Sequence, residues 1–217
     1  MKFFTFIAIL LIFSSCQNYV NKTESIAESN SNPINIQSKS TDTLPQKSGS
    51  LQEMAILANE QAIRLEPSNF KNLPQEIINN LEKRRCAIPQ TWHIKTPHNV
   101  ISGEYSKKGQ KDWAVLCSIN RVSSILIFWN GSTKNVAEIA KSEDIGYFQT
   151  VDSNNEMGFS RVIDTVGKKY IIDHYNSYGG EKPPQIDHEG INDAFAEKAS
   201  YVLYLHRGKW LELQGAD

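Results

Sequence analysis

The sequence predicts an α+β fold in which two N-terminal helices are followed by a mostly antiparallel β-sheet. Apolar residues repeat at helical spacing in residues 51–85, and short apolar runs separated by turn residues follow from residue 99 onward. The connections are too short for parallel crossovers, which need about a dozen residues. With 40% hydrophobic and 22% charged residues among 217, the composition is that of a globular protein.

Two helices are expected before the sheet. The first covers 51–66 and ends before Pro67, because apolar residues recur three and four positions apart at Leu51, Met54, Ala55, Ala58, Ala62 and Leu65. The second runs from Pro74 to about Arg85 and has its proline in the first turn, where the missing N–H is not needed.

The strands are expected after Pro89, where β-branched and aromatic residues become frequent. The strongest candidates are Asn99–Tyr105, Asp112–Ile119 and Val122–Trp129, and the weaker ones are Ile145–Val151, Phe159–Val166 and Lys169–Tyr175. A turn or helix near Ile191–Lys198 is expected to be capped by Asp187 or Asp193. The sequence then predicts a terminal hairpin, in which the strands Ala199–Leu205 and Trp210–Leu213 are joined by a turn at Arg207–Lys209.

Residues 1–15 have the pattern of an export signal. Lys2 supplies the positive start, and Phe3–Phe13 is apolar except for Thr5. A helix needs about 20 apolar residues to span a hydrocarbon core, so this run is too short to be a membrane span.

The next residues, Ser14-Ser15-Cys16, resemble the lipobox of bacterial lipoproteins, with Phe13 where that family usually has an aliphatic residue. The resemblance implies that the Cys16 thiol is diacylglycerylated, that the chain is cut before Cys16, and that the new amino group is acylated, for example with palmitate. A plain secretory signal with an incidental cysteine is the alternative. The expected location is the cell envelope, at the periplasmic or surface face of the outer membrane.

The segment after the lipidated cysteine is expected to be a disordered tether. In residues 17–50, 18 of 34 positions are Ser, Asn, Thr or Gln, and no apolar period is sustained. A flexible coil of this length spans about 30 Å. Residues 16–50 are therefore assigned to the anchor and tether, and 51–217 to a single globular domain. Once Lys2 is removed, 22 basic and 24 acidic residues remain, which argues against a nucleic-acid partner.

The stretch Glu104–Val115 is similar to the loop of FG-GAP-type propeller repeats. Glu104, Ser106, Gly109 and Asp112 occupy the first, third, sixth and ninth positions of that pattern, but Lys108 replaces the carboxylate at the fifth. An ammonium group repels calcium and offers no lone pair, so no metal is expected here. An ordinary glycine turn before a strand is the alternative.

A longer resemblance covers residues 73–217 and is to a group of exported bacterial proteins of unknown function. It rests on Cys86–Gln90, Asp112–Cys117, Ile186–Ile191 and Gly208–Trp210. The resemblance implies that 73–217 is one unit, and it supplies no activity, ligand or catalytic residue.

Cys86 and Cys117 are the two cysteines that remain after lipidation of Cys16. An even number in an exported chain predicts a disulfide. A buried thiol is the alternative for Cys117, because it lies in the apolar run Trp113–Ile119.

The candidate catalytic residues are His174, Asp187, His188 and Glu189, which flank a loop shaped by paired glycines and prolines. The two histidines and a carboxylate have the chemistry for zinc binding or general base catalysis. The chain lacks His-Glu-x-x-His and Gly-x-Ser-x-Gly motifs, so a structural role is favoured. We therefore expect a non-catalytic binding module without a cofactor, whose partners are the membrane and an envelope protein or glycan. An envelope hydrolase, with or without a metal ion, is the alternative, and an envelope-structural or inhibitor protein is a third interpretation.

Overall fold

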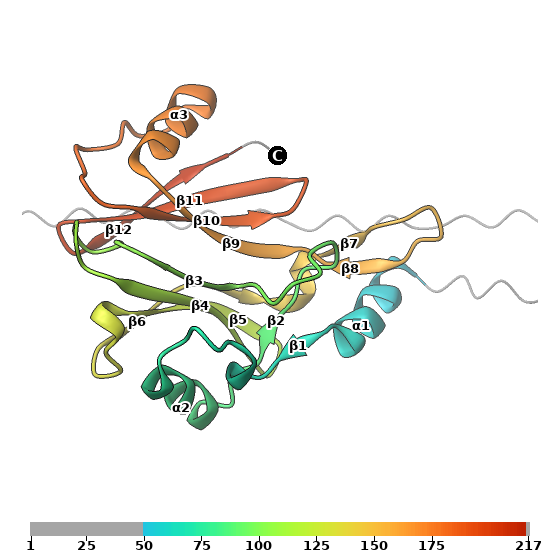
Figure 1. Cartoon of the computed structure of the whole chain (residues 1–217). Coiled ribbons are helices and arrows are strands. Elements are labelled where there is room, and N and C mark those ends of the chain that lie inside the picture. Colours follow the sequence, from blue (N-terminus) through green and yellow to red (C-terminus); the bar gives the residue numbers. More distant parts are fainter. Residues whose placement is uncertain (1–49, 216–217) are drawn as a thin grey trace, which may run out of the picture. The chain divides into compact units, whose positions relative to one another are not determined.

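Two four-stranded antiparallel sheets stack on one another in the computed structural model, which describes residues 50–215 (Figure 1). In bonding order, the first sheet is β3 (Val100–Gly103), β4 (Asp112–Ile119), β5 (Val122–Phe128) and β6 (Val136–Glu143). The second is β12 (Lys209–Gln214), β11 (Ala199–His206), β10 (Gly190–Phe195) and β9 (Arg161–Val166). Two small pairs complete the strands: β1 (Arg64–Leu65) with β2 (Ile88–Pro89), and β7 (Phe148–Thr150) with β8 (Met157–Phe159).

A helix covers the outer face of each sheet, so the layers are helix, sheet, sheet, helix (Figure 1). The helix α2 (Gln75–Lys83) packs on the first sheet, and α3 (Lys168–Tyr178) packs on the second. The remaining helix, α1 (Leu51–Gln61), packs against the β7–β8 hairpin. Short 3₁₀ turns lie at Pro67–Asn69, Trp129–Gly131 and Asp144–Tyr147.

Strand β4 shows why the central strands are apolar along their whole length. Trp113 and Val115 belong to the cluster under α2, whereas Ala114 and Leu116 belong to the cluster between the sheets. Successive side chains of a strand point to opposite faces, and both faces are covered here. The clear hairpin to β5 is closed by Asn120 and Arg121, which have φ angles of 52° and 63°, as a tight hairpin turn requires.

A buried ion pair joins the two sheets in the interior between them. Arg161 of β9 has no exposed surface, and its guanidinium donates two hydrogen bonds to the Asp193 carboxylate of β10, at 2.9 and 2.7 Å. It also donates to the Ser123 hydroxyl of β5 at 2.9 Å and to the Ala140 carbonyl of β6 at 2.6 Å. Burial by itself would lower the pKa of Arg161, but the ion pair with Asp193 outweighs it, so the pKa is raised.

The predicted α+β class, the antiparallel pairing and the terminal hairpin are confirmed. The prediction that both helices precede the strands is wrong in one respect, since Lys169–Tyr175 forms most of α3 and not a strand. The β-branched and aromatic residues Tyr170, Ile171, Ile172 and Tyr175 favour strand locally. In the structure, Ile171 and His174 are buried three residues apart on one helical face.

Three further segments differ from the expectation. The first helix ends at Gln61 because Ala62 is extended, with ψ of 136°, and leads into β1. Residues 191–195 form the central strand β10, where the turn or helix was expected; its Asp193 pairs with Arg161 and caps nothing. Strand β6 was not predicted, since its Ala, Glu and Lys residues have low strand propensity.

Candidate binding site

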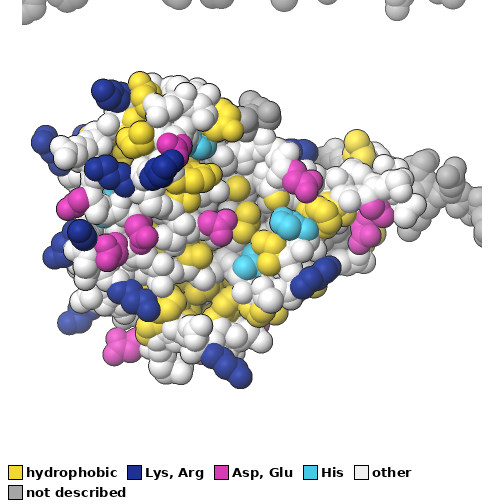
Figure 2. All heavy atoms as spheres, turned by 45° about the horizontal axis from the view of Figure 1, so that its top comes forward, with side chains coloured by type: hydrophobic (Ala, Val, Ile, Leu, Met, Phe, Trp, Pro, Cys, Tyr) yellow, Lys and Arg dark blue, Asp and Glu magenta, His cyan; other side chains and the backbone are white. Residues whose placement is uncertain are grey.

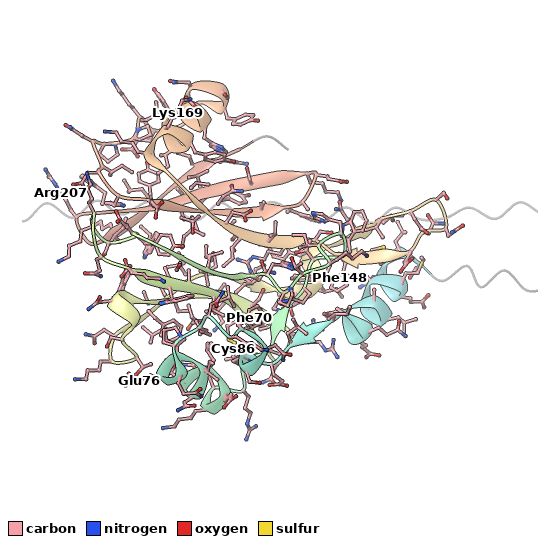
Figure 3. All side chains as sticks on the ribbon, in the orientation of Figure 1. Phe70, Glu76, Cys86, Phe148, Lys169 and Arg207 are labelled. Carbon is pink, nitrogen blue, oxygen red and sulfur yellow. A yellow bond between two sulfur atoms is a disulfide. The ribbon has the colours of Figure 1, made fainter. Side chains whose placement is uncertain are left out.

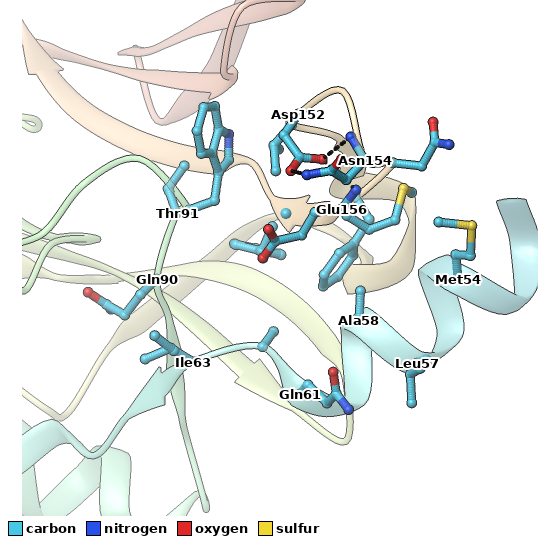
Figure 4. Close-up of a pocket in the computed structure, with 18 of the residues that line it drawn as sticks. Met54, Leu57, Ala58, Gln61, Ile63, Gln90, Thr91, Asp152, Asn154 and Glu156 are labelled. Carbon is cyan, nitrogen blue, oxygen red and sulfur yellow. Dashed lines mark hydrogen bonds between the residues drawn. The ribbon is translucent and has the colours of Figure 1, made fainter. Parts of the chain in front are cut away.

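A cleft of about 870 Å³ opens between α1, segment 90–95 and the β7–β8 hairpin (Figure 4). Its apolar lining includes Met54, Leu57, Trp92, Val151 and Met157. Its exposed polar lining includes Gln61, Lys95, Asp152, Asn154 and Glu156. An apolar floor with a polar margin is the usual composition of a ligand or peptide site.

Helix α1 forms one wall, and its first turn is fixed by a capping box. The Ser50 hydroxyl accepts a hydrogen bond from the Glu53 N–H at 3.3 Å, and the Glu53 carboxylate accepts one from the Ser50 N–H at 2.9 Å. Small side chains at Ala55, Ala58 and Ala62 pack against the core between the sheets. Larger apolar side chains are left outside, so the helix is apolar on more than one face.

A buried carboxylate holds the C-terminal end of α1 in place. Arg64 donates hydrogen bonds to the Asn59 side-chain oxygen of α1 at 2.6 Å and to the Asp144 carboxylate at 2.9 Å. Asp144 is fully buried and also accepts a hydrogen bond from the Ser118 hydroxyl of β4 at 2.6 Å. The helix is therefore attached to the first sheet through Arg64.

Segment 90–98 forms the second wall and is closed by His98. The Thr91 N–H donates to His98 Nε2 at 2.7 Å, so this nitrogen must carry no proton, and Nδ1–H donates to the Thr96 carbonyl at 2.9 Å. Gln90 adds two bonds, accepting from the His98 N–H and donating to its carbonyl. Burial lowers the pKa of His98, against a smaller opposite effect of the Thr96 carbonyl.

The β7–β8 hairpin forms the third wall. Within its turn, the Asp152 carboxylate accepts hydrogen bonds from the N–H groups of Asn154 and Glu156, at 3.0 and 2.8 Å (Figure 4). A Cβ at Gly158 would lie 2.7 Å from the Trp92 Cβ, so the absence of a side chain lets segment 90–95 approach β8. All three walls are thus held by interactions within the chain.

The charges around the cleft are mainly negative. The charged residues of its lining are Asp152 and Glu156 of the β7–β8 hairpin and Lys95 of segment 90–95, and α1 contains Glu53 and Glu60 outside the lining and no Lys or Arg. On the face in Figure 2, Lys and Arg gather at the left-hand end. The right-hand end, where Figure 1 places α1 and the hairpin, has few of them among its acidic, histidine and apolar side chains.

The predicted catalytic residues have structural partners. His174 lies buried on α3 between the rings of Tyr170 and Tyr178, and burial lowers its pKa. His188 is buried with Nδ1 at 2.8 Å from the Glu189 carbonyl. Within residues 50–215, no group of three or more His, Cys, Asp or Glu residues is placed to hold a metal ion.

The two acidic candidates, Asp187 and Glu189, differ in exposure. The Glu189 carboxylate accepts a hydrogen bond from the Glu104 N–H at 2.8 Å, and the Glu189 N–H donates to the Glu104 carbonyl at 3.0 Å. Glu189 therefore ties the start of β10 to the end of β3, and Asp187 is exposed to solvent. We find no arrangement in the described loop that joins these carboxylates to both histidines.

In the loop that resembles a calcium site, hydrogen-bond donors of the protein itself occupy the Asp112 carboxylate. The fully buried Asp112 accepts hydrogen bonds from the N–H groups of Ser106 and Asn130, at 3.0 and 2.8 Å, and from the Gln110 amide at 2.7 Å. Lys108 is exposed and forms no ion pair in the part of the chain that the structure describes.

Cys86 and Cys117 are brought to disulfide distance, with their Cα atoms 5.4 Å apart. Both are buried in the cluster between α2 and the first sheet, on the side of the molecule where Figure 3 labels Phe70 and Cys86. A bond here connects the end of α2 to the middle of β4.

Cys16 and the signal and tether segments lie outside the described residues. No helix in 50–215 is long and apolar enough to cross a membrane. No family model, curated protein or solved structure matches this chain. The lipobox and the resemblance of residues 73–217 to exported bacterial proteins therefore stay predictions.

The cleft residues were missed from the sequence, although two signals point to them. Apart from Met1, the sequence contains two methionines, Met54 and Met157, and both line the cleft. Residues 51–63 also place Leu57, which lines the cleft, off the face that contains the alanines. A helix that is apolar on more than one side is usually covered on more than one side.

Proposed function

We propose that this protein is a lipid-anchored binding module of the bacterial cell envelope, without catalytic activity, that holds a partner in the cleft beside α1. The observation that supports it best is the cleft itself, whose walls are fixed by the capping box, Arg64 and His98 while its apolar floor stays open to solvent. A site that is already formed loses little entropy on binding.

The anchor follows from the first residues of the chain. Lys2, the apolar run 3–13 and Ser14-Ser15-Cys16 support export and acylation at Cys16. The polar tether then supplies about 30 Å of reach, and α1 is the first element after it. The outer membrane, at its periplasmic or surface face, is the proposed location.

The anchor is tested with a Cys16→Ser variant of the full chain. Because the thiol is the acylation point, the variant is expected to move from the membrane fraction to the soluble fraction after export. A Lys108→Ser variant serves as the control and stays with the membrane. A Cys16→Ser protein that remains firmly membrane-bound would show that the anchor is not this cysteine.

The cleft is tested with a photo-crosslinking amino acid in the full-length protein in intact cells. Placed at Leu57, which is 50% exposed in the cleft, it is expected to give a discrete, saturable adduct. Placed at Tyr201, which is 37% exposed on β11, it is expected to give none. Equal labelling from both positions, or no adduct from either, contradicts a binding role for the cleft.

A further inference from the structure

Apart from the cleft, we propose that a second pocket binds a small organic anion that carries a carboxylate or a phosphate group. The pocket has a volume of about 560 Å³ and shares no lining residue with the cleft. Residues 69–73, in the turn before α2, form one side of it. Val100 and Ser102 of β3, with Lys111 and Trp113 around the start of β4, form the other side. A pocket of this volume suits a small-molecule ligand.

The charge of the lining favours an anion. Lys71 and Lys111 are its charged residues, and no Asp or Glu of the described chain belongs to it. Both lysines are exposed, and neither forms an ion pair with another residue in the range 50–215. Two ammonium groups at one pocket without a carboxylate repel each other, so an anion that reaches both is attracted by each.

The turn before α2 places Lys71 at this pocket. The Phe70 carbonyl accepts a hydrogen bond from the Leu73 N–H at 2.9 Å, which closes a four-residue turn. Phe70 and Leu73 are buried in the cluster under α2, whereas Lys71 and Asn72 at the corner of the turn are exposed. Because the apolar ends fix the turn, Lys71 and the Asn72 amide form a prearranged margin of the pocket.

Lys111 is held on the other side of the pocket by Trp113. Its Nζ lies 4.7 Å from the centroid of the indole ring, which is a cation–π contact. Asp112, between them in the sequence, accepts three hydrogen bonds from the neighbouring loops and fixes the backbone there. Ser102 pairs with Trp113 across β3 and β4, so both side chains lie on the same face of the sheet. Ammonium, hydroxyl and amide groups thus line the pocket, and each can donate to an anionic oxygen.

The rest of the lining limits the kind of anion. Trp113 is only 8% exposed, so it offers no open ring on which a base or a sugar could stack. Pro97 and Val100 contribute a small apolar area instead. A long polyanion would need a marked excess of basic residues, whereas the chain has 23 basic and 24 acidic ones. Carboxylates and phosphate monoesters with a compact apolar group have the required chemistry.

The test uses the isotope-labelled mature chain with Cys16→Ser and three probes that share a benzene ring: phenylacetate, phenyl phosphate and neutral benzyl alcohol. We expect one or both anions to shift the backbone amide signals of residues 69–73 and 111–113. The tighter anion, which distinguishes carboxylate from phosphate recognition, is expected to bind at least about tenfold more tightly than benzyl alcohol. Equal affinity for benzyl alcohol, shifts confined to other residues, or no saturable shift at millimolar concentration overturns the inference.

Inorganic phosphate is the fourth probe. If it binds as tightly as the better organic anion, the lysines take up an adventitious ion only, and the inference that the pocket recognises an organic anion is wrong. A weaker effect of inorganic phosphate is the expected result, because it makes no contact with the apolar area at Pro97 and Val100.

Variants locate the binding. Lys71→Gln and Lys111→Gln are each expected to weaken binding of the tighter anion about threefold or more, since each removes a positive charge, whereas Lys71→Arg is expected to keep most of the affinity. Lys168→Gln, at an exposed position of α3, is the control and leaves the affinity unchanged. A urea midpoint close to that of the parent chain shows that each variant is folded. No loss in either pocket variant, or an equal loss in Lys168→Gln, overturns the inference.

This second site is tested separately from the proposed function. Leu57→Asp changes the lining of the cleft and is expected to leave anion binding unchanged. The crosslinking experiment at Leu57 is read without any added anion, so its outcome does not depend on the second pocket. Anion binding that is lost in Leu57→Asp would place the site in the cleft and overturn the inference.

Discussion

The interior between the two sheets, which we call the centre, and the cleft use polar groups in opposite ways. At the centre, the Arg161 guanidinium is fully buried and donates to Asp193, Ser123 and Ala140. At the cleft, Glu156 is exposed and forms no ion pair within residues 50–215. A charge with complete internal partners stabilises one structure, whereas a charge without them remains available to a ligand.

The largest effect is expected from breaking the central ion pair. Asp193→Ala removes the carboxylate that accepts two hydrogen bonds from Arg161 and leaves a buried cation without its counter-charge. We expect unfolding free energy to fall by about 3–5 kcal/mol, measured by urea denaturation of the Cys16→Ser chain. Glu212→Ala, at an exposed position on β12, is expected to change it by less than about 0.5 kcal/mol. A small loss for Asp193→Ala would contradict the role of the pair.

This ion pair also shows the limit of what the sequence predicts. Strands β4 and β5 could be predicted, because their apolar pattern and the turn at Asn120-Arg121 are local signals. Strand β10 could not, because Asp193 becomes compatible with a buried strand only through Arg161, 32 residues away. For α3, the fold buries Ile171 and His174 and overrides the local strand propensity.

The same reasoning applies to the candidate site. His174 and His188 attracted attention because histidines and carboxylates near a loop have catalytic chemistry, yet their partners in the structure are aromatic rings and a backbone carbonyl. The cleft residues Met54, Trp92 and Met157 lie far apart in the sequence and are ordinary side chains one by one. Only the packing of α1 against β8 brings them into one site.

The second prediction concerns the disulfide in the layer under the first sheet. Cys86 and Cys117 are expected to be bonded in the exported protein, so neither thiol should react with an alkylating reagent in denatured, non-reduced samples. Since the bond closes a loop with a sequence separation of 31 residues, its removal by Cys86→Ser and Cys117→Ser together is expected to cost about 3–4 kcal/mol. Full alkylation of both thiols would rule the bond out.

The third prediction tests whether His174 and His188 stabilise the fold or form a functional site. His188→Ala removes a buried ring that is bonded to the Glu189 carbonyl, and His174→Ala removes a ring packed between two tyrosines. Each is expected to lower unfolding free energy by about 1–3 kcal/mol and to leave the crosslinking yield from Leu57 unchanged. Two variants of normal stability that have lost a measured activity would instead identify a functional site.

The smallest effect is expected from pH, and it separates the two regions by chemistry. The ion pair raises the pKa of Arg161, so the centre keeps its charge throughout the physiological range. The wall of the cleft depends on His98, whose Nε2 accepts the Thr91 N–H and can do so only while it is unprotonated. Protonation would place a second N–H against that donor and weaken the closure of segment 91–98.

The sign of this effect follows from the lowered pKa of His98, which results mainly from burial. Because the folded state favours the neutral ring, its contribution to stability is complete above the unfolded pKa of about 6.5 and is lost as pH falls through the lower folded value. Burial lowers the pKa of His174 too, so the wild-type urea midpoint is expected to drop between pH 7.5 and 5.5 for both reasons.

Two variants separate the contributions. His174→Phe removes one titrating ring and keeps the packing between the tyrosines, so the dependence that remains is attributable to His98. Crosslinking from Leu57 is expected to fall at pH 5.5 as segment 91–98 loosens. His98→Gln in that background is expected to flatten the pH dependence of the midpoint further and to remove this loss. A pH dependence of binding that survives without His98 would mean that the wall stays closed when the ring is charged. In that case the carboxylates at the margin, and not the closure of segment 91–98, would set the response of the cleft to acid.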